Sequence, residues 1–397
     1  MIKTLLGMSL LFGGGRDTRN ISTEKDLEQF RRYCQSGYKF IPKAENYNLE
    51  KLFVIFRHGA RAPTRNLTRA WEGQECMSCN LNNSMISDCK RKECSEGDLT
   101  YRGFKQMDTL GKFIKNNYKS LLFDKKIEQG SIKMRATKVP RTHSSLAGVI
   151  RGLTGDTVLQ NVEIPVSDDT LLNTLGCTSQ KEKEDVTAFF DKPNIIQDNH
   201  AFNRHPRPQE RVDHYYTSLC SRVQVDCKEL NCDIKSVEEH IKAANDAWEY
   251  LANIGGSTDE RRKTTFGRFA RDLLLDIGEE KYIFLYSAHD SSMSAVLTGL
   301  DTGISEWPSY ASALFIEVWC NMGKQYVRMV FNDRVVRPKS FPSDYIPIRE
   351  FMGFLKKTIP SAPDKNPEKP DSKDTRDDTD TEEKIEKNEG AAKTNPA

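Results

Sequence analysis

The sequence predicts an α/β fold, in which a mostly parallel sheet is flanked by helices and an inserted, mainly helical cap domain interrupts the core. Three observations carry this prediction. Short apolar runs rich in β-branched and aromatic residues alternate with segments of helical spacing. Long connections separate these runs, as crossovers between parallel strands require. A polar, proline-containing stretch in the middle of the chain breaks the alternation.

Three apolar runs are expected to form the parallel strands: Leu52–Phe56, Ile132–Ala136 and Tyr282–Tyr286. Ala313–Trp319 and Gln325–Phe331 form a further pair. The residues between them include Asn321-Met322-Gly323, whose turn chemistry predicts an antiparallel hairpin.

A helix is expected after each of the first three strands. In Leu99–Tyr118, apolar residues recur at helical spacing, and either Asp98 or Thr100 can cap its start. The second helix is expected to begin near Arg141, and the third to span Ser291–Leu300. This succession of strand and helix favours a sheet whose core strands are parallel.

The chain is predicted to have four parts. Helical patterning over Val237–Ile254 indicates the cap. Segment 361–397 is charged and almost free of large aliphatic residues, so it cannot bury enough apolar surface to offset its ordering entropy and is expected to be disordered. The predicted boundaries are 1–15 for a signal peptide, 45–164 and 263–359 for the α/β core, 165–262 for the cap and 361–397 for the tail.

The composition is that of an ordinary globular protein, with 37% hydrophobic and 29% charged residues and a net charge of +2. This charge gives no overall attraction to nucleic acid or to membrane surfaces. No apolar stretch reaches the length of about 20 residues that spans a bilayer. We therefore expect neither a nucleic-acid partner nor a transmembrane segment.

The first fifteen residues have the layout of a secretory signal. Lys3 precedes an apolar run over Thr4–Phe12, and three glycines follow. A buried N-terminal strand is the alternative. Asn20, Asn66 and Asn82 each begin a tripeptide that accepts an N-linked glycan if the chain enters a suitable secretory pathway. We expect a secreted or lysosome-like location.

Ten cysteines follow this leader, and four of them are clustered. The cluster consists of Cys76, Cys79, Cys89 and Cys94. Such a group could bind zinc in a reducing compartment or form two disulfides in an exported protein, and export favours the disulfides. The other six are expected to pair within the cap or across to it, in a connectivity that the sequence does not fix. They are Cys34, Cys177, Cys220, Cys227, Cys232 and Cys320.

The most informative segment is Arg57-His58-Gly59-Ala60-Arg61-Ala62-Pro63, directly after the first predicted strand. Two guanidinium groups repel one another unless an anion lies between them, and their planar forks fit phosphate oxygens. A histidine between them is placed to attack phosphorus. Gly59 is expected to let the backbone approach the phosphate closely.

Two further segments follow predicted strands. Tyr286-Ser287-Ala288-His289-Asp290 lies between a strand and a helix, and Arg141 lies where another helix begins. Ligands of parallel α/β sheets bind outside the carboxyl ends of the strands. These segments are therefore expected to meet Arg57 and His58 in one pocket. Arg135 is interpreted as a structural ion-pair partner.

These segments resemble the histidine acid phosphatases, the branch of the histidine phosphatase superfamily that includes prostatic and lysosomal acid phosphatases and, more distantly, phytases. The resemblance covers roughly residues 50–345 and includes the family's R-H-G-x-R-x-P, L-T-x-x-G and Y-S-A-H-D patterns. It implies that His58 is a nucleophile forming a phosphohistidine and that Asp290 protonates the leaving alcohol. It also implies that no metal or cofactor takes part. The implied phosphate ligands are Arg57, Arg61, Arg141 and His289.

Elementary electrostatics agrees with these implied roles. Three nearby cations should lower the pKa of His58 and keep its imidazole neutral and nucleophilic in acid. Asp290 must carry a proton to act as a general acid, which favours acidic pH. The resemblance therefore implies an acid phosphatase that hydrolyses phosphate monoesters, either small molecules or phosphorylated peptides. It also raises the expectation of a homodimer.

Two positions depart from the prostatic type. Ala60 stands where many animal acid phosphatases have Asp, and Lys138 lies in a segment that is acidic there. We expect this more basic rim to tolerate more anionic substrates. A specialised phytase-like or lysophosphatidate phosphatase is the alternative enzyme. The alternative from another class is a non-catalytic secreted binding protein on the same fold.

Overall fold

A computed structural model describes residues 32–65, 67–79, 89–118, 132–155, 162–163, 170–172, 208–225 and 258–360, with helical residues between 241 and 253 except 243, 247 and 251. The predicted leader 1–15, the tail 361–397 and the glycan acceptors Asn20, Asn66 and Asn82 lie outside these residues. The predicted domain boundaries remain predictions. Among the described residues, no helix is long and apolar enough to cross a bilayer.

The core is a mixed sheet in the order β10-β9-β8-β1-β7-β5-β6. Its core strands β1, β7, β5 and β6 are parallel, whereas β8, β9 and β10 run antiparallel, with β11 added beside β9. The strands are β1 (Asn48–Arg57), β5 (Ile132–Ala136), β6 (Val162–Glu163), β7 (Ile283–Ala288), β8 (Ala313–Asn321), β9 (Lys324–Phe331), β10 (Arg334–Val336) and β11 (Ile346–Pro347). The predicted α/β class is confirmed.

Side chains of β1 that point to opposite faces of the sheet belong to two different layers of the core. Leu52, Val54 and Phe56 belong to one buried cluster, whereas Phe53 and Ile55 belong to the other. Because successive side chains of a strand point to opposite faces, this central strand is apolar on both faces. Such a strand needs helices on both faces.

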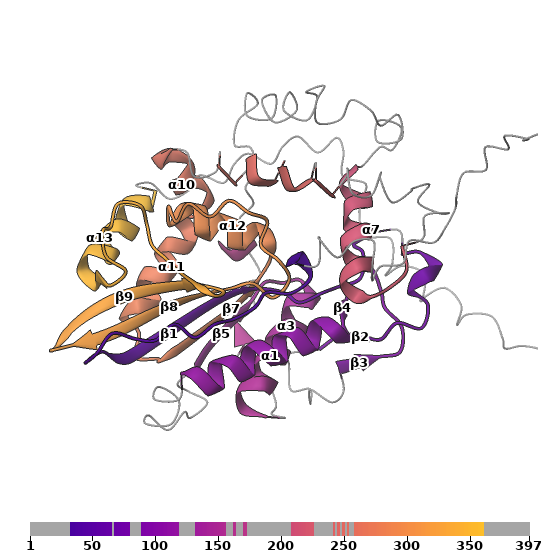
Figure 1. The fold of residues 1–397 in the computed structure, drawn as a ribbon, viewed down its shortest axis with the longest axis horizontal. Helices are drawn as coiled ribbons and strands as arrows, with labels where there is room; N and C mark the ends of the chain where they lie inside the picture. The colour runs from indigo at the N-terminus through magenta and orange to yellow at the C-terminus, as the bar shows by residue number, and fades with distance from the viewer. Residues whose placement is uncertain are drawn as a thin grey trace, which may run out of the picture. The chain divides into compact units, whose positions relative to one another are not determined.

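Helices cover both faces of the sheet (Figure 1). On one face lie α1 (Tyr101–Asn117) and α3 (Pro140–Thr154), which pack on the cluster that contains Val54. On the other face, residues of α11 (Gly267–Gly278), α12 (Asp290–Gly299) and α13 (Ile348–Thr358) join the second cluster. Short α10 (Asp259–Thr265) precedes α11. The three helices predicted after the strands are α1, α3 and α12.

Two details of the elements were open in the sequence. Thr100, and not Asp98, caps α1: its hydroxyl oxygen accepts a hydrogen bond from the Gly103 amide at 3.0 Å. The β8–β9 turn places Met322 at φ 48° and Gly323 at φ 72°. Two consecutive positive φ angles match the twist of a two-residue hairpin.

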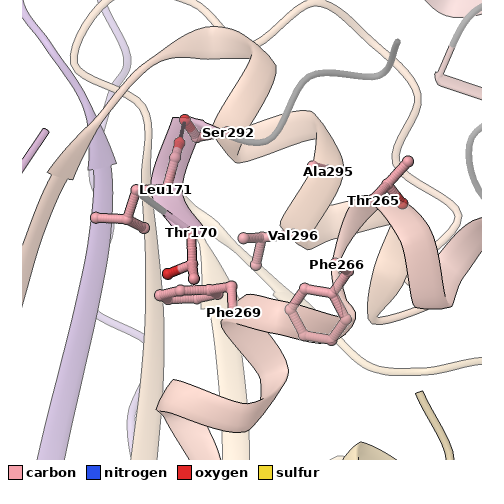
Figure 2. Close-up of a pocket in the computed structure, with 8 residues that line it drawn as sticks. All are labelled: Thr170, Leu171, Thr265, Phe266, Phe269, Ser292, Ala295 and Val296. Carbon is pink, nitrogen blue, oxygen red and sulfur yellow. Dashed lines mark hydrogen bonds between the residues drawn. The ribbon is translucent and has the colours of Figure 1, made fainter. Parts of the chain in front are cut away.

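The predicted cap is described in part. It contributes η5 (Thr170–Leu172), α7 (Pro208–Ser221) and the helical residues between 241 and 253. The Ser292 hydroxyl donates to the Leu171 carbonyl and ties η5 to α12, as Figure 2 shows. The small hollow beside this bond is largely apolar and has no room for a water-sized molecule. It is a packing defect and not a ligand site.

Disulfides join the clustered cysteines in two pairs, Cys76–Cys94 and Cys79–Cys89. Their loop forms a small sheet of β2 (Cys76–Met77), β3 (Lys90–Arg91) and β4 (Leu99–Thr100), with η2 (Arg69–Trp71) before it. A third disulfide, Cys34–Cys220, links the N-terminal segment to α7. Of the described cysteines, Cys320 alone is unpaired.

Candidate active site

Three parallel strands end side by side, and the residues after them form the site. Arg57 pairs with Ala288 at the ends of β1 and β7, and the His58 amide donates to the Ala288 carbonyl at 3.0 Å. On the other side of β7, the Thr137 amide donates to the Ser287 carbonyl. This register brings together segments that are about 230 residues apart in the chain, as the sequence predicts.

His58 is held with one ring nitrogen engaged. Its Nδ1 lies 2.8 Å from the Gly59 carbonyl oxygen, which can only accept, so Nδ1 carries the proton. In the neutral ring, Nε2 then bears the free electron pair. The side chain is only 2% exposed, and its ring centre lies 5.5 Å from that of His289.

Gly59 has a packing role that the sequence did not predict, whereas its expected role in letting the backbone approach phosphate stays a prediction. A Cβ on Gly59 would overlap the Gly103 backbone carbonyl of α1, and one on Gly103 would overlap the Ala60 carbonyl. Thr100 reinforces this contact, because both its amide and its hydroxyl donate to the Ala60 carbonyl. The N-terminal turn of α1 therefore fixes the loop that carries the nucleophile candidate.

Arg57 is buried and surrounded by partners. Its Nη2 lies 2.7 Å from Asp290 Oδ2 and donates to the Tyr33 hydroxyl at 2.6 Å, while Nη1 donates to the Pro308 carbonyl. Its guanidinium also stacks 4.1 Å from the Tyr310 ring centre. The sequence predicted none of these three neighbours, Tyr33, Pro308 and Tyr310, for Arg57.

Asp290, the first residue of α12, receives two further hydrogen bonds. The Trp307 indole donates to Oδ2 at 3.1 Å, and the Ser291 amide donates to Oδ1 at 2.9 Å. Burial alone would raise the pKa of this carboxyl group. Arg57, the Trp307 hydrogen bond and Arg61 outweigh that effect and lower the pKa to about 2.

Arg61 pairs with a residue that sequence analysis missed, Asp213 of α7. Arg61 Nη2 lies 2.7 Å from Oδ1 and Nη1 lies 3.1 Å from Oδ2. The amide and hydroxyl of Thr64 also donate to Asp213 Oδ2, at 2.9 and 3.0 Å. No motif surrounds Asp213, so only the folded chain reveals it.

Arg141 begins α3 directly after Pro140, which suits the first position of a helix. Its Nη2 lies 3.5 Å from His289 Nδ1, and it forms no ion pair with a carboxylate of the described residues. Burial first, and Arg61 next, lower the pKa of Arg141 to about 10. It is the least compensated cation of the site.

Both site histidines resist protonation. Burial is the largest cause, and it lowers the pKa of His58 well below its usual range, followed by Arg141 and Arg57. The same causes, burial and then Arg141, lower the pKa of His289 to about 3. The sequence predicted the effect of the cations but not that burial exceeds it.

Each of the three arginines has one N–H donor that no acceptor in the described part of the chain uses, the one on Nε. No hydrogen-bond acceptor among the described residues reaches the buried Nε atom of Arg57, Arg61 or Arg141. An orphaned buried donor costs roughly 1–3 kcal/mol, so three in one place indicate a site that awaits an anion. All six residues singled out from the sequence lie here: Arg57, His58, Arg61, Arg141, His289 and Asp290.

Other predicted residues lie away from this anion site. Arg135 pairs with Asp272 at 2.7 Å, which agrees with a structural role. Lys138 is exposed near the start of α3. Among the described residues, no group of three or more His, Cys, Asp or Glu side chains could hold a metal ion.

Comparison with known proteins matches a family model to just under half of this chain. Residues 48–233 match the histidine phosphatase superfamily (branch 2). A Dictyostelium discoideum protein named as an acid phosphatase is 24% identical over 302 residues, covering 65% of this chain and 63% of that protein. A Caenorhabditis elegans protein named as an acid phosphatase is 22% identical over 310 residues, which cover 71% of this chain and 68% of that protein. The chain thus spans just under two thirds of the first relative's length.

Solved structures share the fold. A phytase of Klebsiella sp. ASR1 superposes with a TM-score of 0.54 at 15% identity, covering 80% of this chain and 98% of that one. A phytase of D. castellii gives a TM-score of 0.52 at 15% identity, and the superposition covers 83% of this chain and 84% of that one. At these identities the likeness concerns the fold alone.

Proposed function

We propose that this chain, whose residues 48–233 belong to branch 2 of the histidine phosphatase superfamily, is an acid phosphatase that hydrolyses phosphate monoesters through a phosphohistidine on His58. The observation that carries the proposal is the set of three unfilled Nε donors around a histidine whose Nε2 is free to attack. Phosphate oxygens match these donors in charge and geometry.

In the first step, His58 Nε2 forms a bond to phosphorus while the bond from phosphorus to the ester oxygen breaks. Asp290, carrying a proton, gives it to the departing alkoxide. Arg57, Arg61 and Arg141 offset the charge that spreads over the phosphoryl oxygens, and His289 contributes a further contact. In the second step, water attacks phosphorus, Asp290 takes a proton from it, the bond from phosphorus to nitrogen breaks and inorganic phosphate leaves.

Asp290 links this scheme to acid. With its pKa at about 2, the carboxyl group is ionised at mildly acidic pH in the empty site. A bound phosphate ester offsets the positive charge of Arg57 and Arg61, the two cations that lower this pKa. The pKa of Asp290 therefore rises on substrate binding, and acidic pH increases the fraction that carries the required proton.

The proposal also includes a substrate class, a cellular location and an oligomeric state. Small phosphate monoesters or phosphorylated peptides are the expected substrates, and exposed Lys138 favours anionic ones. Three disulfides support a secreted or lysosome-like compartment, because disulfides persist in oxidising surroundings. A homodimer remains part of the expectation. A specialised phytase-like or lysophosphatidate phosphatase would use the same catalytic residues.

The test is phosphate release from an aryl phosphate between about pH 3 and 8, with EDTA present, by the wild type and His58→Ala. We expect an acidic optimum, no effect of the chelator, and a loss of about 10⁴-fold or more in the variant. Quenching in alkali during turnover, under which phosphohistidine survives, should trap label from a ³²P-substrate on His58.

Two outcomes would contradict the proposal. Wild-type turnover that His58→Ala retains would exclude the phosphohistidine. A folded wild type that neither hydrolyses aryl phosphates, phytate or lysophosphatidate nor binds vanadate would support the alternative of a non-catalytic binding protein. Circular dichroism of the variant shows that any loss of activity does not come from misfolding.

A further inference from the structure

Asp213 lies on the cap helix α7 and contacts the phosphate-binding segment directly. Its carboxylate engages both terminal nitrogens of Arg61 and two donors of Thr64. The Arg61 and Asp213 side chains are only 11% and 17% exposed. A shielded bidentate pair with four hydrogen bonds on one carboxylate is an organised contact and not an incidental surface ion pair.

The pair leaves one edge of Arg61 open. A guanidinium has five N–H donors, two on each terminal nitrogen and one on Nε. Nη1 donates to Asp213 and to the Ala62 carbonyl, and one Nη2 hydrogen points to Asp213. Nε is buried and has no acceptor among the described residues. The edge formed by Nε and the other Nη2 hydrogen can therefore bind two oxygens of an anion while Asp213 stays in place.

Helix α7 is itself fixed at this site. Cys220, about two turns after Asp213, is disulfide-bonded to Cys34. Next to Cys34, the Tyr33 ring stacks 3.8 Å from the ring of Tyr216 on α7, and the Tyr33 hydroxyl accepts from Arg57. One helix thus reaches Arg61 directly and Arg57 through Tyr33.

We propose that Asp213 is a positioning residue for phosphate binding. Asp213 binds the two terminal nitrogens of Arg61, so that the edge formed by Nε and Nη2 faces the anion. The Cys34–Cys220 disulfide keeps α7 in the position from which Asp213 makes this contact. This inference rests on the proposed function, since it assigns Arg61 to the phosphate. It gives a helix of the predicted cap a part in organising the phosphate-binding residues.

The opposite role makes a different prediction. If Asp213 instead occupied the phosphate's place on Arg61, its removal would strengthen anion binding. Asp213→Asn keeps the size of the side chain and removes its charge. We expect the inhibition constant for inorganic phosphate and the KM for an aryl phosphate to rise by about tenfold, because truncating one partner of a shielded charge pair is costly. Tighter phosphate binding in this variant would overturn the proposal.

A double-mutant cycle separates positioning from structural damage. If Asp213 acts only through Arg61, Asp213→Asn changes the phosphate inhibition constant in the wild type but not in the Arg61→Ala background. Asp272→Asn is the matched control, because it breaks an ion pair of the same length with Arg135 away from the site. It should lower thermal stability without changing phosphate affinity. Equal effects of Asp213→Asn in both backgrounds would overturn the proposal.

Cys34→Ser/Cys220→Ser tests the disulfide. We expect a several-fold higher inhibition constant for phosphate that Asp213→Asn raises little further. An unchanged phosphate affinity in a folded double variant would refute this part. If the wild type itself shows neither turnover nor phosphate or vanadate binding by calorimetry, the proposed function fails. If the wild type is active and Asp213→Asn matches it, only the present inference fails.

Discussion

Among the described residues, Arg328 inside the sheet contrasts with the three arginines of the site at the sheet's edge. Arg328 of β9 pairs with Glu317 of β8, with Nε 2.6 Å from the carboxylate. Its Nη1 donates to the Pro42 carbonyl and the Tyr345 hydroxyl, and Nη2 donates to the Ile41 carbonyl. All three nitrogens of Arg328 are engaged.

The site arginines differ in this respect. Arg57, Arg61 and Arg141 each keep a buried Nε without an acceptor among the described residues, and Arg141 lacks a direct carboxylate partner there. Full satisfaction marks an arginine that stabilises the fold, because a buried polar group without a partner is costly. A single unfilled Nε does not mark a ligand site, because structural Arg135, which pairs with Asp272, also has one. Three such donors gathered beside one histidine do indicate arginines whose partner is a ligand.

The largest expected contrast comes from the same substitution in both groups. Arg328→Met leaves the Glu317 carboxylate buried with only the Tyr118 hydroxyl and the Trp319 indole as donors. It should lower the free energy of unfolding by about 3–5 kcal/mol. Arg141→Met removes a poorly compensated cation, so stability should stay the same or rise, whereas kcat/KM should fall by about 10²–10³-fold.

Urea unfolding and steady-state kinetics on both variants check this contrast. Methionine is long and apolar at both positions, so each variant is the control for the other. A loss of several kcal/mol in Arg141→Met, or a large loss of activity in an equally stable Arg328→Met, would contradict the assignment of the two groups.

The site arginines also act on the buried histidines, and this effect can be measured as a dependence of the free energy of unfolding on pH. In the unfolded chain, His289 takes up a proton near its ordinary pKa of about 6.5. In the folded chain burial and Arg141 lower that pKa to about 3. The unfolded state therefore binds more protons between these values, and stability falls as pH decreases, by up to about 1.4 kcal/mol per pH unit from this group.

Thermal unfolding of the wild type and His289→Asn at pH 7, 5 and 4 measures this effect. The variant should lose less stability on acidification than the wild type. His143→Asn is the control, because His143 is less buried and its lowered pKa should contribute less. The same acid slope in the wild type and His289→Asn would show that His289 is protonated in the folded site.

Sequence patterns predicted the core and the ends of its strands well. Leu52–Phe56 lies within β1, and the segments that follow β1, β5 and β7 converge as expected. These predictions succeed because apolar periodicity and a compact motif are local signals, and parallel strands bring their carboxyl ends together without further information.

Contacts from distant, polar parts of the chain could not be predicted. Tyr33, Asp213 and Trp307 reach the site from a segment before β1, from the cap and from a loop after α12. None lies in a motif, and an isolated aspartate or tyrosine in a polar stretch resembles any solvated residue. Electrostatic states depend on such contacts, and so the ionised, Arg57-paired form of Asp290 in the empty site was not apparent either.

The smallest expected effect concerns the link between α1 and the nucleophile loop. Thr100→Val keeps the shape of the side chain but removes the cap on the Gly103 amide and the hydroxyl bond to the Ala60 carbonyl. Stability should fall by about 1 kcal/mol, with a change of KM smaller than that caused by any arginine substitution. Thr109→Val in the same helix removes only an exposed bond to the Lys105 carbonyl and should change little. Equal stability of the two variants would show that Thr100 does not fix the loop, and the close contact between Gly59 and Gly103 would then have to position His58 alone.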